Sequence, residues 1–304
     1  MGNLKERYLE NLANNGYSEG TIRNYKYIIA GKIAQQAEED FGKDIYEFTY
    51  EECIDLLKRF NNRSLDIVAV NKSAFEFYID FAIQEGYVPS RINYFTGLQR
   101  SDLEIFVDKN AIKNRYLTYD ELLELENMCN NAQDSVIYRL LFIGVRGQQC
   151  EEILNLKVSD VFKDHIKLPD RDIPIDEYTY DLIQEAINQK TYLKNNGDVS
   201  PTNKSGSTVE LKESEYVLRA SGSTKEGQIS YTALRVRFNK IRRFWDNPYL
   251  NMRNVWFSGM IHELKNIKQA TGEITKEDLI KVHKQFGYNE AYIFKTLTEI
   301  EKYL

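Results

Sequence analysis

The sequence predicts a mainly α-helical protein with one small β-hairpin, divided into two domains. Apolar residues recur at the three- and four-residue spacing of amphipathic helices along most of the 304-residue chain. A polar stretch, residues 108–115, separates a purely helical first part from the rest and is the predicted linker. Short apolar runs on either side of Pro169-Asp170 predict the hairpin, over residues 165–174.

Residues 1–107 are expected to form a helical domain of four or five helices. Ser18 can cap a helix, and Thr49 with Glu52 makes a capping box three residues apart. Gly86 and the irregular stretch after it end the last long helix of this part. The expected helices cover residues 4–17, 19–37, 50–60 and 64–86.

The second domain, residues 116–304, is expected to combine helices with the hairpin. Residues 194–214 are rich in Gly, Ser, Asn and Lys, which is typical of a surface loop, and residues 216–218 could form a short strand. Ser230 can cap a markedly basic helix. The expected helices cover residues 118–128, 138–145, 151–156, 178–193, 230–245, 250–264, 275–286 and 290–304.

Composition limits the classes of protein that this chain can belong to. Its three cysteines and three histidines have no disulfide-framework or zinc-site spacing, so we expect no metal and no cofactor. No apolar run reaches the roughly 18 residues of a membrane span, and the charged first residues do not resemble a signal peptide. A reducing cytoplasm is therefore the expected compartment.

The net charge of −6 argues mildly against a generic nucleic-acid-binding protein, which is usually basic overall. The charges are unevenly distributed, however. Between residues 219 and 243 there are seven basic residues and one acidic residue, Glu226. A locally basic face on an acidic protein can bind DNA with a strong dependence on salt.

The stretch from Tyr138 to Phe162 is the best candidate for a site that holds a phosphate. An apolar helix breaks at Arg146-Gly147, and a second helix begins just after it. An arginine beside a helix start, with unpaired backbone donors around it, is suited to bind an anion. On spacing alone, a solvated arginine at a helix end explains the same pattern.

The order of motifs resembles the tyrosine recombinase (phage integrase) family along essentially the whole chain. The matching segments are SEGTIRNYKYII, VNKSAFEFYIDFAIQEGYV, GVRGQQCEEILNLKVSDVF, IPI, EYVLRASGSTKEGQISYTALRVRFNKI, LNMRNVWFSG and KQFGYNEAYIFKTL. The resemblance implies a helical core-binding domain followed by an α+β catalytic-fold domain. It also implies chemistry in which arginines and a lysine stabilise a pentacoordinate phosphate while a tyrosine hydroxyl attacks it.

The resemblance assigns the phosphate-holding cations to particular positions. Arg146 stands where the family has its first arginine, although aligning the following glutamates would place Gln149 there. The hairpin lysine matches Lys167, and Arg171 is an equally good match. Arg253 matches the arginine of the family's His-x-x-Arg motif.

The reactive groups of the family are missing at the expected positions. Leu250 replaces the histidine of His-x-x-Arg, and Tyr288 replaces the histidine of the later Leu-Gly-His motif. The nucleophile position, about nine residues later, is Leu297. Tyr292 comes too early and Tyr303 too late unless the last helix shifts. Without the nucleophile the covalent route is lost, whereas the arginines can still hold the DNA backbone.

The sequence therefore predicts a non-enzymatic, sequence-specific repressor that binds double-stranded DNA. This departure resembles a degenerate branch of the family, the master repressors of SPβ-like temperate phages, which maintain lysogeny. An active recombinase that uses Tyr303 or Tyr292 and an accessory protein-interaction module are the alternatives. Further partners could be an antirepressor protein or a small homo-oligomer. Besides Arg146, Lys167, Arg171, Arg253 and Tyr288, the predicted DNA contacts are Arg23, Lys26, Lys72, Lys225, Arg235, Arg237 and Lys240.

Overall fold

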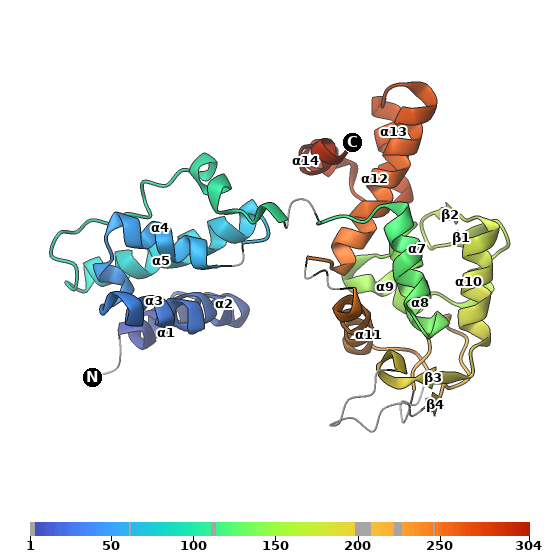
Figure 1. Ribbon diagram of the computed structural model, residues 1–304, viewed down its shortest axis with the longest axis horizontal. Helices are drawn as coiled ribbons and strands as arrows, with labels where there is room; N and C mark the ends of the chain where they lie inside the picture. The colour runs from blue at the N-terminus through green and yellow to red at the C-terminus, as the bar shows by residue number, and fades with distance from the viewer. Residues whose placement is uncertain are drawn as a thin grey trace. The chain divides into compact units, whose positions relative to one another are not determined.

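The computed structural model describes residues 4–60, 62–110, 114–197, 208–221, 227–245, 247 and 249–304. The chain forms two compact units, residues 1–113 and 114–304. Helices dominate both units, and the described strands form two antiparallel pairs (Figure 1). The predicted mainly helical class with a small β-hairpin is confirmed. Among the described residues, no helix combines the length and apolar character needed to cross a bilayer.

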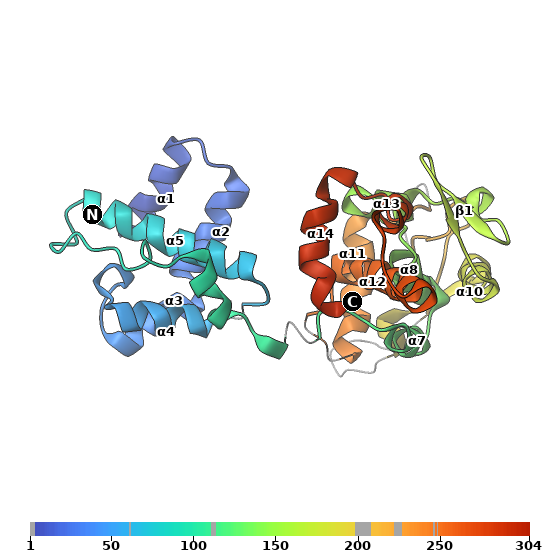
Figure 2. The ribbon, with the colours of Figure 1, turned by 90° about the horizontal axis from the view of Figure 1, so that it is seen from above.

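The first unit is a bundle built around its longest helix, α5. This helix contacts α1, α2 and α4, and it buries Phe75 and Tyr78 completely. Figure 2 shows α1, α2, α3 and α4 arranged about α5. The helices are α1 (Leu4–Asn14), α2 (Glu19–Ala30), α3 (Lys32–Phe41), α4 (Tyr50–Arg59) and α5 (Leu65–Gln84), followed by a 3-10 helix, Arg100–Phe106.

The helix starts of this unit agree with the predicted caps. The Ser18 hydroxyl accepts a hydrogen bond from the Thr21 amide, and Thr49 and Glu52 form both bonds of a capping box. The single helix predicted over residues 19–37 is wrong, because the chain breaks at Gly31. A Cβ at position 31 would lie 2.1 Å from the Tyr27 carbonyl oxygen, so only glycine permits this close turn.

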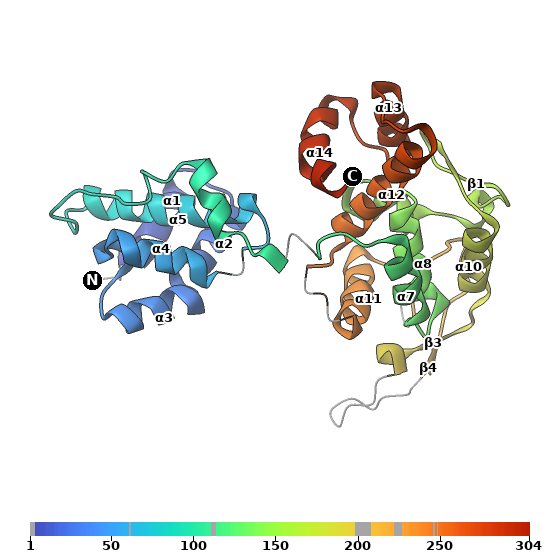
Figure 3. The ribbon, with the colours of Figure 1, turned by 45° about the horizontal axis from the view of Figure 1, so that its top comes forward.

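The second unit is organised around α8, which contacts α7, α10, α11 and α12. Figure 3 shows these helices together in one cluster, with α13 and α14 beside the far end of α12. Each residue of α8 from Gln133 to Phe142 is buried, so this helix is the centre of the core. The helices are α7 (Tyr119–Asn127), α8 (Ala132–Phe142), α9 (Glu151–Asn155), α10 (Glu177–Asn188), α11 (Tyr231–Phe244), α12 (Met252–Thr271), α13 (Lys276–Gln285) and α14 (Ile293–Ile300).

Two short β-ladders lie at opposite ends of α10 (Figure 1). The predicted hairpin is present as β1 (His165–Lys167) and β2 (Asp172–Pro174), with Ile166 opposite Ile173. A second pair, β3 (Thr191–Leu193) and β4 (Thr208–Glu210), lies where a helix end and a surface loop were predicted. The strand predicted over residues 216–218 is reduced to a bridge between Lys157 and Tyr216. Helix α12 extends past the predicted end, to residue 271.

Gly259 allows α12 to pack directly against the end of α8. A Cβ at this position would lie 1.6 Å from the Phe142 carbonyl oxygen, far inside van der Waals contact. We expect Gly259→Ala to destabilise the protein by about 1–3 kcal/mol, because the two helices must separate. Thermal unfolding followed by circular dichroism measures this loss. Gly20→Ala on α2, where the nearest atom is 3.8 Å away, is the matched control and should cost little.

Candidate nucleic-acid interface

The turn between α8 and α9 carries Arg146 and has an unusual backbone. Gln149 and Cys150 follow each other with φ of 51° and 62°, a left-handed conformation that costs a non-glycine residue roughly 1–2 kcal/mol. Burial raises the pKa of the Cys150 thiol, which therefore stays protonated. Strained turns of this kind persist only where the surrounding structure fixes them.

Two of the backbone donors expected to be unpaired in this turn are already bonded. The Arg146 amide donates to Glu152 Oε2 at 2.7 Å, and the Gln148 amide donates to Glu151 Oε1 at 3.3 Å. The two carboxylates thus occupy the place that an anion would take at the start of α9. The expectation of unpaired donors is therefore wrong for these two amides, and the side chain of Arg146 is the candidate group for binding an anion.

The Arg146 guanidinium lies against the indole of Trp256. Its Cζ is 5.5 Å from the ring centroid, and its buried Nε has no hydrogen-bond partner among the described residues. Trp256 itself is almost fully buried on α12. A guanidinium held by a ring face retains its full charge and its donors, so it can still bind a phosphate.

Arg253 lies at the start of the same helix and is exposed to solvent. Its Cζ is 4.3 Å from the Phe257 centroid, one helical turn further along. Cys150 Sγ lies 3.5 Å from Met252 Sδ, so the turn that carries Arg146 packs beside the start of α12. These contacts place the two predicted arginine side chains against adjacent rings of α12, Arg146 against Trp256 and Arg253 against Phe257.

Tyr288 joins the same cluster from the chain after α13. Its ring is 5.3 Å from that of Trp256 and 6.1 Å from that of Phe257. Beneath it, the fully buried His283 lies with its ring 5.7 Å away, and its Nδ1 is 2.8 Å from the Leu279 carbonyl oxygen. Sequence reasoning missed His283 and Trp256 as members of this site. In the sequence, only their nearness to predicted site residues pointed to this place. His283 precedes Tyr288 by five residues, and Trp256 follows Arg253 by three.

The two hairpin candidates, Lys167 and Arg171, have different environments. Lys167 is exposed in β1, opposite Asp172. The Arg171 side chain is only 10% exposed and donates to both Glu152 oxygens at 2.8 Å. It also donates to the carbonyl oxygens of Gln285, at 2.8 Å, and Gly144, at 3.2 Å. Arg171 therefore joins the hairpin to the three segments that carry Gly144, Glu152 and Gln285. This inward position disfavours the predicted DNA contact.

Burial alone would lower the pKa of the Arg171 guanidinium by disfavouring its charged form. The hydrogen bonds and negative charge of Glu152, with a smaller contribution from Asp170, outweigh burial and raise this pKa. The pair is thus held in its charged state inside the protein. Because Glu152 is neutralised by Arg171, it does not cancel the charge of the Arg146 guanidinium.

The basic helix α11 presents only some of its cations to solvent. Arg235 is exposed and Lys240 is half-buried. Arg237 is only 7% exposed, donates to the Arg219 carbonyl oxygen at 2.9 Å and stacks 4.4 Å from the Tyr192 ring centroid. Arg237 therefore anchors the helix, contrary to its predicted contact with DNA. Lys225 lies outside the described residues.

The predicted contacts of the first unit fall into two groups. Arg23 and Lys26 are exposed on α2, and neither has an acidic partner within the part of the unit that the structure describes. Lys72 on α5 forms an ion pair with Glu76, one turn away, at 2.8 Å, and its side chain is mostly buried. Arg23 and Lys26 thus remain candidates for DNA contact, and Lys72 is the weaker one.

The leucines that stand where the resemblance predicts a histidine and the nucleophile are packing residues. Leu250 is fully buried in the core, and Leu297 packs against the apolar cluster formed by α12, α13 and α14. Tyr303 packs edge to face on Tyr116, with centroids 4.7 Å apart. Tyr292 is the accessible alternative, because it is 50% exposed and its ring lies 6.0 Å from that of Tyr288.

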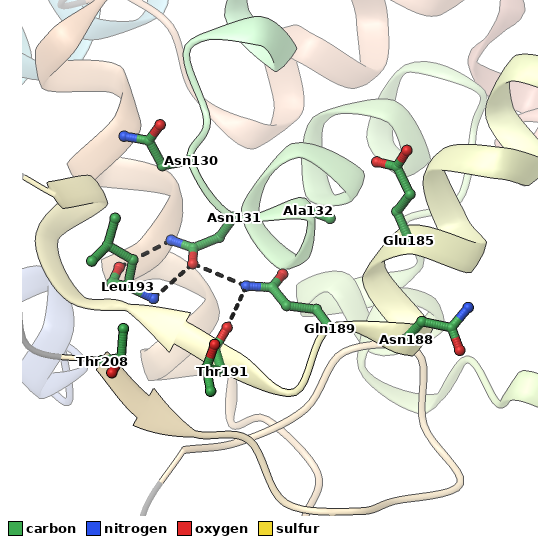
Figure 4. Close-up of a pocket in the computed structure, with 9 residues that line it drawn as sticks. All are labelled: Asn130, Asn131, Ala132, Glu185, Asn188, Gln189, Thr191, Leu193 and Thr208. Carbon is green, nitrogen blue, oxygen red and sulfur yellow. Dashed lines mark hydrogen bonds between the residues drawn. The ribbon is translucent and has the colours of Figure 1, made fainter.

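A hollow beside β3 contains none of the predicted residues (Figure 4). It has a volume of about 540 Å³ and is lined mainly by amide and hydroxyl side chains. Asn131 bonds both the amide and the carbonyl of Leu193, and Gln189 bonds Asn131 and Thr191. These amides satisfy one another, so they offer few free groups to a ligand. Among the described residues, no group of three or more metal-ligating side chains is present.

Comparison with protein families identifies the chain. A model of the MrpR C-terminal catalytic domain matches residues 116–303, and a model of the MrpR N-terminal core-binding domain matches residues 2–84. The chain belongs to the MrpR family. One relative in this comparison is the SPbeta prophage-derived uncharacterized protein YopR of Bacillus subtilis (strain 168). It is 24% identical, over 99% of this chain and 92% of YopR.

Solved structures show the fold that this MrpR-family chain adopts. A lambda integrase dimer bound to a COC' core site aligns with a TM-score of 0.52 and 14% identity, over 96% of this chain and 75% of the integrase chain. A second lambda integrase dimer, residues 75–356 on the same core site, gives 0.51, again at 14% identity, over 96% and 93% of the two chains. The predicted two-domain, tyrosine-recombinase-like architecture is therefore confirmed.

Proposed function

We propose that this MrpR-family protein is a sequence-specific, double-stranded DNA-binding transcriptional repressor that maintains phage lysogeny and does not cut DNA. One observation carries the proposal. The cations that would hold a phosphate, Arg146 and Arg253, are kept together on the rings of α12, whereas a packed leucine, Leu297, occupies the nucleophile position. Such a site can bind the backbone of a duplex without forming a covalent bond to it.

The remaining exposed cations support a contact along the DNA backbone. Arg235 and Lys167 in the second unit, and Arg23 and Lys26 in the first, all have side chains that reach solvent. In the lambda integrase complexes, a protein of this fold is bound to a DNA core site. Several such phosphate contacts would make the affinity fall steeply with increasing salt concentration.

Fragmented genomic DNA from the source of the protein tests the proposal. We expect the purified full chain to retain a discrete set of fragments at low salt and to release them intact on a denaturing gel. The recovered fragments would define the operator. Retention of all fragments alike, or of none, would contradict a sequence-specific repressor.

The proposed site of action is the cytoplasm of the bacterial host. The proposed further partners are an antirepressor protein or a second copy of the chain.

Tyr292 supports a second candidate function, an active recombinase with a displaced nucleophile. Its exposed ring lies beside Tyr288, which contacts the ring that holds Arg146. In this mechanism the Tyr292 phenol oxygen forms a bond to phosphorus and loses its proton. The bond to the deoxyribose oxygen then breaks, and that oxygen leaves with a proton. The result would be protein covalently attached to a nicked strand.

We expect no covalent adduct from the wild-type protein and no effect of Tyr292→Phe on DNA retention. Incubation with nicked operator fragments, followed by denaturing electrophoresis, measures the adduct. Tyr303→Phe is the matched control, because Tyr303 packs on Tyr116 and is less exposed than Tyr292. An adduct that forms with the wild type and the Tyr303→Phe variant but disappears in Tyr292→Phe would establish the recombinase instead.

A further inference from the structure

Four tyrosines and one isoleucine of the first unit form a surface that we call the tyrosine face. It consists of Tyr46, Tyr50, Tyr87, Ile92 and Tyr94. Tyr46 is half-buried, and the other four side chains are exposed, Ile92 most of all at 49%. Contiguous exposed side chains of this kind mark interaction sites on proteins. None of the five is among the predicted DNA contacts.

Two ring contacts hold the tyrosine face together. Tyr46 belongs to the 3-10 helix Ile45–Glu47, and Tyr50 is the first residue of α4. Each pairs with a ring from the loop that follows α5 at the end of the bundle (Figure 1). The ring centroids of Tyr46 and Tyr87 are 5.8 Å apart, and those of Tyr50 and Tyr94 are 6.3 Å apart. Since both pairs join the same two segments, the two pairs lie side by side.

The loop that carries three of these side chains is fixed from within the unit. Val88, near the start of the loop, is buried, and Phe95, just after its end, stacks on Phe75. Between them, the Asn93 side chain donates to the Asp80 carboxylate at 2.7 Å. A surface that is ordered before binding loses little conformational entropy when a partner arrives.

The segment that carries Tyr46 and Tyr50 is acidic. Residues 44–52 contain four acids and no base. Burial, followed by the negative charges of Asp44 and Glu47, raises the pKa of the Tyr46 phenol, so these carboxylates lie close to its ring. The tyrosine face therefore combines aromatic rings with negative charge.

Charge selects the kind of partner that fits this face. Glu51 is exposed and, like Glu47, forms no ion pair with a cation in the part of the chain that the structure describes. The loop over residues 87–94 adds one base, Arg91, so the acids predominate. An acidic surface repels DNA and anionic membranes and attracts cations. Arginine in particular stacks on tyrosine rings and bonds carboxylates, and tyrosines are enriched where proteins bind proteins.

We propose that the tyrosine face is a docking site for another protein, whose docked segment presents arginine or lysine side chains next to apolar ones. The cations of this segment lie over the tyrosine rings and pair with Glu47 and Glu51, and its apolar side chains cover Ile92. This inference goes beyond the proposed function and does not depend on it, because it concerns a protein partner of the first unit and not a DNA contact.

Selection from a library of short random peptides displayed on phage tests the inference. The full chain is the bait, and a double variant, Tyr50→Ala with Tyr94→Ala, removes peptides that bind elsewhere. We expect the peptides retained by the wild type alone to be enriched in arginine and lysine and depleted in aspartate and glutamate. Both replaced tyrosines are exposed, so circular dichroism of the double variant should match that of the wild type.

Fluorescence anisotropy with one selected peptide, synthesised with a label, measures the separate contributions. We expect Tyr94→Ala to lower the affinity about tenfold, as for an important interface residue. Glu51→Gln should lower it about two- to fivefold, the range of an exposed ion pair. The matched controls are Tyr17→Ala, between α1 and α2, and Glu104→Gln, in the 3-10 helix Arg100–Phe106. Both controls should bind the peptide as the wild type does.

Three outcomes would overturn the inference. Acidic peptides in the selection, or none that separates the wild type from the double variant, would rule out a site for a basic segment. Self-association of the wild-type chain in analytical ultracentrifugation that disappears in the double variant would make a second copy the partner. Loss of DNA retention in the double variant would assign the face to DNA. A wild-type protein that retains no DNA would contradict the proposed function alone, because the peptide selection uses no DNA.

Discussion

Arg253→Glu lowers the affinity of the protein for every DNA sequence by about 30- to 150-fold. A hydrogen bond from a charged group contributes roughly 2–3 kcal/mol, and this amount corresponds to the stated factor. The substitution removes a cation from the exposed start of α12 and puts an anion in its place. Because every DNA sequence carries the same phosphates, the affinities of the protein for specific and for non-specific DNA should fall by the same factor.

Fluorescence anisotropy with operator and random duplexes, each at several salt concentrations, measures this effect. The slope of the logarithm of affinity against the logarithm of salt concentration should become shallower by roughly 0.9 for each phosphate that the protein no longer neutralises. Lys276→Glu, a charge reversal at the exposed start of α13, is the matched control. If Arg253→Glu leaves operator affinity unchanged, the phosphate role of Arg253 is wrong.

Glu152→Ala destabilises the second unit by about 3–5 kcal/mol, because it leaves the buried Arg171 guanidinium without its carboxylate. Glu152 also accepts the Arg146 amide, so the turn that carries Arg146 loses its main support. We expect the melting temperature to fall by about 6–20 °C, given roughly 2–4 °C per kcal/mol for a unit of this size. Calorimetry on the full chain measures the change.

The neighbouring Glu151→Ala is the matched control, because Glu151 bonds only an exposed amide, that of Gln148, at 3.3 Å. Its cost should stay near 1 kcal/mol. Replacing both partners, Glu152→Leu with Arg171→Leu, should recover part of the missing stability, since an apolar pair of similar volume carries no buried charge. A double variant no more stable than Glu152→Ala would show that Arg171 acts through its other bonds.

Local signals in the sequence were sufficient to predict most of the helices. Capping residues such as Ser18, Thr49 and Ser230 act within three residues of the helix start, so their bonds are present where predicted. The break at Gly31 was missed because it depends on a close backbone approach inside one helical pattern. The β3–β4 pair was missed because residues 194–207 separate its two strands, which is far longer than the turn of a recognisable hairpin such as β1–β2.

The candidate site was predictable as a set of residue types but not as a set of orientations. The resemblance to recombinases selected Arg146 and Arg253, and the structure places their guanidinium groups against two adjacent rings of α12, Trp256 and Phe257. Nothing in the sequence distinguishes Lys167, which reaches solvent, from Arg171, which turns inward to Glu152. Arg237 was misjudged for the same reason, since burial of an arginine depends on partners far away in the sequence.

The close approach of Gly287 to Arg171 has a consequence for how such sequences can change over time. A Cβ at position 287 would lie 2.7 Å from the Arg171 guanidinium, which in turn is held by Glu152. A substitution at any one of these three positions is tolerated only if the others change with it. We therefore expect Glu152, Arg171 and Gly287 to covary among relatives as one unit, which a lineage keeps or loses together.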